Sequence, residues 1–436
     1  MNGRNVSQRR LVKNQERVRV NVDYEQFKLD NGLTVILRKY SCVPVVAVDV
    51  CYHVGSKNEK PGKTGFAHLF EHLMFEGSEN VKKGEFDKYI SLAGGYNNAY
   101  TTEDVTNYYD VLPSNQLPLS LWLESDRMLK FSVTNEALST QREVVKEEKR
   151  WRIDNRPYGD ASEKMQSLVF PASRYHWPVI GSMEDLNGAT MDDVREFYEQ
   201  YYRPNNAVLV ISGDIDFKKT EKWVLQYFSN IPPSSSPIQP VPIEERPLAK
   251  EVVKTMTGDV PSTAIFIAYR IPQDGSEEYY ALTQLGKILS DGNSSRLYKK
   301  LVYETQAVSD FDISIEGLEK AGVFMFSAFV TPGHSEKEAL KIFDEEIDRL
   351  RNAAVSNYEF VKAQNATLSS YVGRLSVNSG VADALAHYHT FFDDAGMINS
   401  EVDRELSVTP DMMVDAARRF LLEEKRVVLH YYPAKR

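Results

Sequence analysis

The sequence predicts an α+β protein made of two homologous domains, each a mostly antiparallel sheet packed with helices. Strand and helix patterns are mixed in both halves without regular strand–helix–strand alternation, which favours the α+β class. Segments of the first half reappear in the second half at a nearly constant spacing. Between the halves, residues 231–247 are rich in proline, which interrupts helices and strands alike, and they predict a linker.

The internal repeat rests on two pairs of segments. The strand pattern that includes Ala47 returns at Ala264, 217 positions later. The helix start at Thr190 and the strand after it are matched by a helix start at Thr409 and its strand, 219 positions later. Amphipathic helices resemble one another by chance, but the agreement between the two offsets favours a duplication.

The repeat and the linker define the expected domains. A polar arm rich in Arg and Lys covers residues 1–22 and lacks the apolar core of a signal peptide. The first domain covers residues 23–230 and carries the candidate site, and the second, residues 248–436, is expected to lack metal ligands. No apolar run is long enough to span a bilayer, so no membrane span is predicted.

The composition excludes some classes of function. The chain has 436 residues, with 42% hydrophobic and 26% charged residues, which is typical of a soluble globular protein of two or three domains. Its net charge of −10 argues against a nucleic-acid partner, because phosphate binding needs clustered cations. Cys42 and Cys51 lie in apolar, strand-like sequence and are expected to be small core residues.

The strongest chemical signal is a helix over residues 64–76 that carries His68, Glu71 and His72. Positions i, i+3 and i+4 share one face of a helix, so both imidazoles can reach one metal ion with the carboxylate beside them. Two histidines suit zinc, and a neighbouring carboxylate can take a proton from water and later deliver it to a leaving amine. The alternative is a solvated helix face, but the flanking residues are strongly apolar. Burying these groups without a compensating ion costs several kcal/mol.

A catalytic zinc site needs a third protein ligand from elsewhere in the chain. The best source is a second helix, which Thr134 can cap and which runs towards Trp151. It carries Glu143, Glu147 and Glu148. Acidic residues on a helix usually form a solvated face, so these residues alone do not decide which of the three is the ligand.

At these motifs the chain resembles the pitrilysin/insulinase family of zinc peptidases, whose inverted motif is H-x-x-E-H. The half-length members of that family include the mitochondrial processing peptidase and bacterial homologues. The similar stretches cover nearly the whole chain and are residues 30–36, 65–78, 98–101, 178–181, 202–207 and 294–297.

The resemblance implies a role for several residues. It implies that Glu148 joins the two histidines as the third ligand of one Zn²⁺ per chain, and that Glu71 is the general base. It also implies that Asn98 and Ala99, which follow a turn at Gly94, form the edge strand that adds a substrate backbone as another strand. The alternative for Asn98 is an ordinary turn residue.

Two departures from the family pattern matter. Gln141 stands where the family usually has a glutamate, seven positions before the zinc-binding one, and changes behind a ligand weaken metal binding or activity by about 10–100-fold. Val302 and Ser309 stand where many members have an Arg and a Tyr that contact the substrate. Neither replacement supplies a cation or a phenol hydroxyl for a developing oxyanion.

The resemblance therefore implies a zinc-dependent endopeptidase that hydrolyses peptides or unstructured segments in an enclosed chamber. The missing pair leads to the hypothesis that this chain is the metal-bearing subunit of a heterodimer, whose homologous partner supplies the Arg and Tyr. The alternative is a non-catalytic structural or peptide-binding subunit of the same family. The expected compartment is the cytoplasm or the periplasm.

Overall fold

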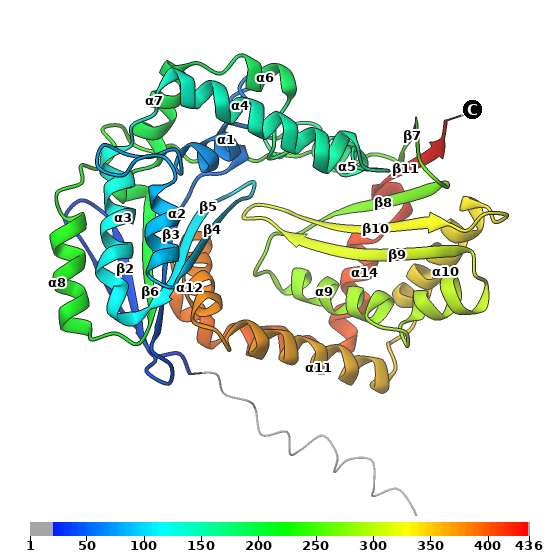
Figure 1. Ribbon diagram of the computed structural model, residues 1–436. Helices are drawn as coiled ribbons and strands as arrows, with labels where there is room; N and C mark the ends of the chain where they lie inside the picture. Colours follow the sequence, from blue (N-terminus) through cyan, green and yellow to red (C-terminus); the bar gives the residue numbers. More distant parts are fainter. Residues whose placement is uncertain (1–20, 435–436) are drawn as a thin grey trace, which may run out of the picture.

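The computed structural model describes residues 21–434, which form two halves, each built around one sheet (Figure 1). The first sheet consists, in spatial order, of β1 (Glu25–Lys28), β2 (Thr34–Lys39), β6 (Ala207–Gly213), β3 (Val45–Tyr52), β5 (Thr106–Pro113) and β4 (Tyr96–Thr101). The second consists of β7 (Val252–Gly258), β11 (Arg426–Pro433), β8 (Ala264–Ile271), β10 (Gly322–Val330) and β9 (Val308–Gly317).

The two sheets share one topology. From β2 to β4 and from β7 to β9, strands of corresponding chain order occupy corresponding places. In each sheet one pair is parallel, β2 with β6 and β7 with β11, and the remaining pairs are antiparallel. The prediction of an α+β protein with two homologous, mostly antiparallel domains is therefore confirmed.

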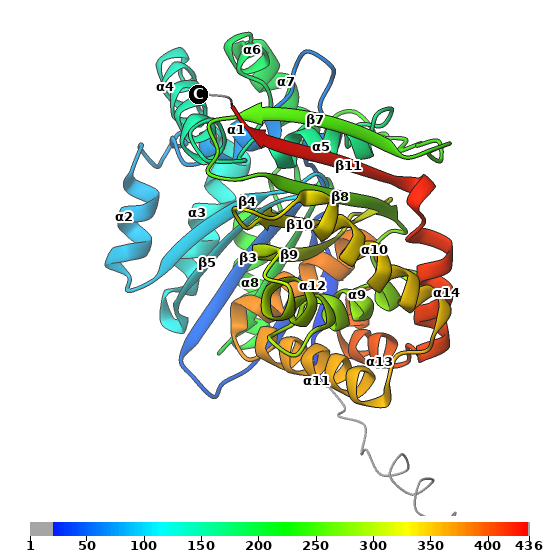
Figure 2. The ribbon, with the colours of Figure 1, turned by 90° about the vertical axis from the view of Figure 1, so that its right-hand side faces the viewer.

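Helices pack on both sheets (Figure 2). Those of the first half are α1 (Phe66–Leu73), α2 (Glu85–Leu92), α3 (Leu117–Lys130), α4 (Asn135–Lys149), α5 (Ala161–Val169), α6 (Met183–Asn187), α7 (Met191–Tyr201) and α8 (Phe217–Phe228). Those of the second half are α9 (Glu277–Ser290), α10 (Glu336–Asn352), α11 (Asn357–Arg374), α12 (Asn378–Phe392), α13 (Glu401–Leu406) and α14 (Pro410–Phe420). The side chains of Thr134, Thr190 and Thr409 cap α4, α7 and α14, as their sequence positions predict.

One helix of each half packs on the sheet of the other half. α12 packs on β3 and β6 of the first sheet, and its residues share a buried cluster with Ala47, Cys51 and Val210. α5 packs on β8 and β11 of the second sheet, and Met165 shares a cluster with Phe266. The cores of the two halves are thus completed by segments from across the linker.

The connecting segments differ in how they are held. Residues 229–251, which contain the predicted linker, hold no helix or strand. Of the predicted arm, residues 1–20 lie outside the described part, whereas Val22 is buried and its backbone N–H and C=O bond the side chain of Asn399.

Cys51 is buried, but the prediction for Cys42 is wrong, because it lies in the exposed turn between β2 and β3. Within residues 21–434, no helix is long and apolar enough to cross a membrane.

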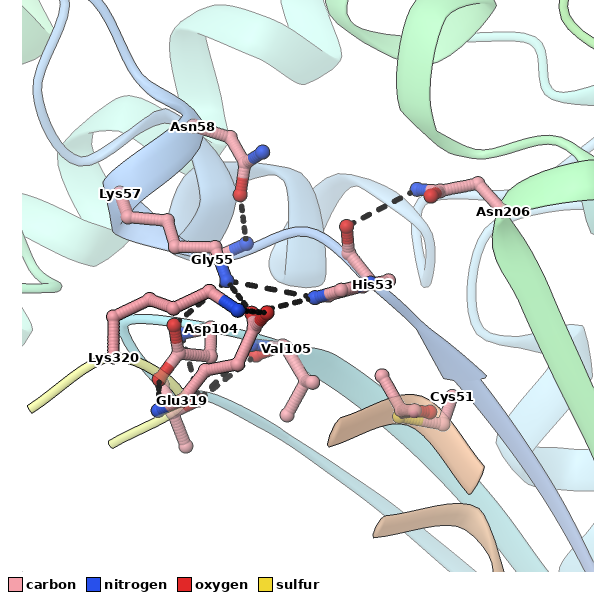
Figure 3. Close-up of polar contacts among 12 residues, drawn as sticks. Cys51, His53, Gly55, Lys57, Asn58, Asp104, Val105, Asn206, Glu319 and Lys320 are labelled. Atoms are coloured by element: carbon pink, nitrogen blue, oxygen red, sulfur yellow. Dashed lines mark hydrogen bonds and ion pairs between the residues drawn. The ribbon is translucent and has the colours of Figure 1, made fainter. Parts of the chain in front are cut away.

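A largely buried ion-pair group, which we call the clasp, joins the two halves where two hairpin turns meet (Figure 3). It consists of His53, Lys57, Asp104 and Glu319. Glu319, in the turn between β9 and β10, donates its N–H to Asp104 Oδ2 at 2.9 Å. Lys57 Nζ lies 2.7 Å from Asp104 Oδ1 and also pairs with Glu319, and His53 Nε2 lies 2.8 Å from Glu319 Oε2. The second half is therefore anchored to the turn between β4 and β5.

We expect Glu319→Gln to lower the free energy of unfolding at pH 7 by about 1–3 kcal/mol, because Lys57 loses one of two buried partners. Burial opposes ionisation of Glu319, but the hydrogen bond from His53 and the charge of Lys57 hold the pKa of that carboxyl below its usual range. A lowered pKa contributes stability that is present above the unfolded value of about 4.3 and is lost as the pH falls below it.

Urea unfolding of the wild type and the variant between pH 7 and pH 3 tests this expectation. The difference between the two proteins should narrow as the pH drops below about 4. Glu304→Gln, in an exposed pair with Lys300, is the matched control and should change stability by less than about 0.5 kcal/mol. A constant difference across this range would show that the ionised form of Glu319 is not what stabilises the clasp.

Candidate metal centre

The start of α1 is fixed by backbone contacts. Gly65 precedes the helix with φ of 83°, and a Cβ there would lie 2.6 Å from the carbonyl oxygen of Ile180. The buried carboxylate of Glu59 accepts the N–H of Gly65 at 2.9 Å and that of Ala67 at 2.8 Å. These amides have no carbonyl partner within the helix, so Glu59 supplies the cap that Gly65 cannot. The orientation of α1 is thereby set one turn before the first histidine.

The structure brings two histidines of α1 together with a glutamate of α4. His68 Nε2 and His72 Nε2 lie 3.7 and 3.2 Å from Glu148 Oε2. One possible ligand atom from each residue falls within 4.8 Å of the others. Within residues 21–434 this is the one such group of three or more His, Cys, Asp or Glu side chains. The two helices pack directly against each other.

The geometry distinguishes among the three acidic candidates on α4. Glu143 and Glu147 are exposed and pair with Lys146 and Arg150, one turn further along the same helix. Glu148 is only 15% exposed. The guanidinium of Arg152 lies 2.8 Å from Glu148 Oε1, which leaves Oε2 facing the histidines. Of the three glutamates, Glu148 is the one whose carboxylate lies beside both histidines.

The spacing of these atoms fits zinc. Tetrahedral bonds of about 2.0–2.2 Å place ligand atoms about 3.4 Å apart, close to the observed 3.2 and 3.7 Å. The two imidazole rings stand edge to face, with centroids 4.9 Å apart. His68 Nδ1 is buried and has no hydrogen-bond partner within the described residues, so packing rather than a second hydrogen bond orients this ring.

The surroundings favour the ligand forms of these side chains. Burial and the neighbouring His72 lower the pKa of His68 to about 4, so its imidazole is neutral at pH 7. A hydrogen bond from His72 lowers the pKa of Glu148, and the nearby guanidinium of Arg152 adds to the shift. Burial raises the pKa of Glu71, although a hydrogen bond from Thr101 opposes the shift. Thr101 Oγ1 lies 2.6 Å from Glu71 Oε2, so Oε1 is left free of this contact.

Gln141 lies two turns before Glu148 on α4. Its Nε2 donates to Glu76 Oε1 at 2.6 Å, and Glu76 also pairs with Lys83. The Oε1 atom of Gln141 is buried without a partner within residues 21–434. Gln141 thus contacts Glu76, which lies one turn beyond His72, and forms no hydrogen bond to any of the three candidate ligands.

Asn98 and Ala99 lie in β4, the edge strand of the first sheet. Within residues 21–434, β4 pairs with β5 on one side and with no strand on the other. Asn98 is exposed, and its Oδ1 accepts the N–H of Ala99 at 2.9 Å. Ala99 packs against the core cluster that includes α1, and Thr101 on the same face reaches Glu71. The exposed edge therefore passes directly beside the candidate base.

The two positions where many family members carry an Arg and a Tyr lie in the second half and hold Val302 and Ser309. Val302 is half-buried against the core of the second half, and the exposed Ser309 bonds the carbonyl of Phe329. Arg296 forms two hydrogen bonds to Glu359, at 2.6 and 2.9 Å. This arginine is committed to a pair within its own half.

Sequence reasoning missed two residues of the site, Thr101 and Arg152. Thr101 ends β4 with its hydroxyl on Glu71 of α1, 30 positions earlier, and no local motif marks this contact between strand and helix. Arg152 could have been found, because it follows Glu148 by four positions and such pairs meet on a helix.

Two family models match the chain. Residues 34–165 match the model described as insulinase (peptidase family M16), and residues 188–367 match the peptidase M16 inactive domain. The first match contains the three candidate ligands and Glu71, and the second contains Val302 and Ser309.

Relatives and solved structures agree with the family models. A zinc protease of Helicobacter pylori, PqqE, is 30% identical over 378 residues, which is 86% of this chain and 85% of that protein. The crystal structure of a protease from Helicobacter pylori is 28% identical, with a TM-score of 0.90 over 95% of this chain and all of that one. The periplasmic protease PqqL of Escherichia coli is 18% identical and has the same fold, with a TM-score of 0.76. This chain covers 48% of its length.

Proposed function

The chain belongs to the M16, or insulinase, family of peptidases, and we propose that it is a zinc-dependent endopeptidase acting on extended peptide segments. The observation that carries this proposal is the convergence of His68, His72 and Glu148 within 4.8 Å, with Glu71 beside them. Relatives named zinc proteases support the choice of metal.

In the proposed mechanism, His68, His72 and Glu148 would hold one zinc ion. Zinc held by three protein ligands keeps an open position, polarises a carbonyl group and lowers the pKa of water. Glu71 is the general base: Thr101 holds its Oε2, and its Oε1 takes the proton of the attacking water. The same carboxyl then delivers the proton to the departing amine.

We propose that the substrate binds by adding a strand to the edge of β4. Asn98 and Ala99 lie on this edge, and no strand of the described part of the chain pairs with its outer side. Backbone pairing of this kind holds any extended peptide, while pockets beside the edge select side chains. The N–H of Ala99, now bonded to Asn98, is available to an incoming carbonyl if that side chain turns away.

We further propose that this chain is the metal-bearing subunit of a heterodimer. Val302 and Ser309 supply no group that can stabilise a developing oxyanion, so a homologous partner would provide the Arg and Tyr. This chain covers 48% of the PqqL chain, so that protein has room for a second unit of similar length. A chamber closed by two such units would exclude folded proteins and admit peptides.

Assays of the purified chain alone and mixed with a homologous chain that has the Arg and Tyr test this arrangement. We expect one zinc per chain in both samples and peptide cleavage that rises at least about tenfold in the mixture, since one missing oxyanion donor costs about 10²–10³ in kcat. Full activity of the isolated chain would contradict the heterodimer and leave the zinc mechanism intact. A zinc-free chain would contradict both.

A further inference from the structure

A small acidic and aromatic pocket lies on the face of the first sheet that α12 covers. Asp49 of β3, Tyr109 of β5 and both Tyr96 and Tyr100 of β4 line it, together with Asp383 and the first turn of α12. Its volume is about 270 Å³. Cavities that enclose whole small-molecule ligands span roughly 300–1,000 Å³, so this pocket has the size for one side chain.

The strand register connects this pocket to the proposed substrate edge. Tyr109 lies opposite Asp49 on one side and opposite Asn98 on the other, and residues opposite one another share a face of the sheet. Tyr96 and Tyr100, two positions from Asn98, lie on that same face. Ala99 and Thr101 lie on the opposite face, towards α1.

A peptide strand added to β4 presents its side chains alternately to these two faces. One set of side chains points towards α1 and the candidate metal centre, and the intervening set points towards the pocket. Since α12 belongs to the second half, both halves build the wall that these side chains meet.

Asp49 shows what kind of group the pocket lacks. Its side chain is buried, at 1% exposure, and Oδ2 accepts a hydrogen bond from Asn107 Nδ2 at 3.0 Å. Oδ1 is also buried and has no hydrogen-bond partner within the described residues. Burial raises the pKa of this carboxyl, and the charge of Asp383 adds to the shift. Asp49 lines the pocket, so a positive charge held there would favour the ionised form of this buried carboxyl.

The other groups of the pocket favour a positively charged donor. Asp383 accepts a hydrogen bond from Tyr100 Oη at 2.6 Å, and no Lys or Arg is among the described residues that line the pocket. The nearby Arg374 lines the adjoining cavity instead, where it bonds Tyr388 Oη at 2.7 Å. Tyrosine rings attract cations through their π faces.

We propose that this pocket is a specificity site that receives an arginine or lysine side chain of the peptide held along β4. The proposal rests on strand addition at β4, which is part of the proposed function. Asp49 and Asp383 would pair with the cation while Tyr96 and Tyr109 cover its alkyl stem. The class of substrate is therefore an extended peptide with a basic residue at one fixed distance from the cleaved bond.

Peptide binding to a Glu71→Gln chain tests the proposal without cleavage. The probes are unstructured peptides in which one arginine moves stepwise through a neutral background, each with a twin that carries citrulline, a neutral group of the same shape. At one position we expect the arginine peptide to bind at least about tenfold more tightly than its twin, equivalent to about 1.4 kcal/mol. Fluorescence anisotropy of labelled peptides provides the affinities.

Variants of the residues that line the pocket test whether the preference for arginine over citrulline arises there. In the same Glu71→Gln background, Asp49→Asn should reduce the tenfold ratio to less than about threefold, and Tyr96→Ala, at an exposed side chain, should reduce it as well. Asp393→Asn is the matched control, because it removes the same charge at the other end of α12. Asn tolerates the left-handed backbone at this site, where φ is 54°. The control should keep the full ratio.

Equal affinity for arginine and citrulline at every position would overturn the proposal, as would a ratio that Asp49→Asn and Tyr96→Ala both leave unchanged. If Asp49→Asn does not fold, Asp383→Asn and Tyr96→Ala decide. The proposed function is read separately, from cleavage by the wild type. Peptides that bind with the preference but are never cut would contradict the peptidase and not the pocket.

Discussion

Replacing Glu71 by Gln is expected to lower kcat for peptide hydrolysis by about 10²–10⁴-fold while the chain keeps its zinc. The amide has the size of the carboxylate and can still accept the hydrogen bond from Thr101. It cannot take a proton from water at neutral pH. The two histidines and Glu148 are untouched, so metal content should remain at one zinc per chain. Cleavage of a quenched fluorescent peptide, with metal analysis of the same samples, measures both quantities.

The control for this variant is Glu79→Gln, which removes the same charge a short distance along the chain. Glu79 is 61% exposed, and within residues 21–434 its carboxylate pairs only with Lys130, so kcat should stay within about twofold of the wild type. Cleavage that survives Glu71→Gln would mean that another group is the base and that the proposed mechanism is wrong. Loss of zinc from this variant would instead assign Glu71 a part in holding the metal.

The candidate metal centre was predictable where it depends on local spacing. His68, Glu71 and His72 share a face because any helix places positions i, i+3 and i+4 together. The third ligand comes from another helix, and its identity depends on how α4 is rotated about its axis. That rotation is set by packing, for example by the burial of Val145 beside α1, which sequence spacing does not encode.

The fold, too, was predictable from the sequence in some features and not in others. Strand order and register repeat in both sheets. The nearly equal offsets of 217 and 219 positions between repeated segments predict such a duplication. The exchange of α5 and α12 between the halves was not predictable, because the apolar residues of a helix do not specify which sheet it covers. The clasp between Lys57 and Glu319 joins residues 262 positions apart, and nothing near either residue in sequence marks the other.

The edge strand β4 combines a feature predicted from the sequence with contacts that only the structure shows. Its sequence predicted a strand, and the structure adds that its two faces lead to different sites: Thr101 to Glu71, and Tyr100 to Asp383. The turn that follows it is held by the clasp through Asp104. A single strand thus connects the candidate base, the proposed basic-residue pocket and the contact between the halves.

Replacing Glu148 by Gln is expected to weaken zinc binding by at least about 100-fold, since changes behind a ligand already cost 10–100-fold and this change removes the ligand charge itself. The side chain keeps its volume, so α4 should remain packed on α1 and the Tm of the metal-free chain should change little. The dissociation constant for zinc, from competition with a chelating dye, is the measurement. Activity should fall in proportion to zinc occupancy and recover in part when zinc is added in excess.

Glu147→Gln is the matched control, because it changes the same residue type one position earlier on the same helix. Glu147 is 68% exposed and pairs with Arg150 instead of facing the histidines, so zinc affinity should stay within about twofold of the wild type. The contrast between neighbouring positions separates a ligand from a general effect of negative charge near the metal, which would weaken both variants alike. Equal losses in the two variants would therefore contradict the assignment of Glu148, and so would an unchanged affinity in Glu148→Gln.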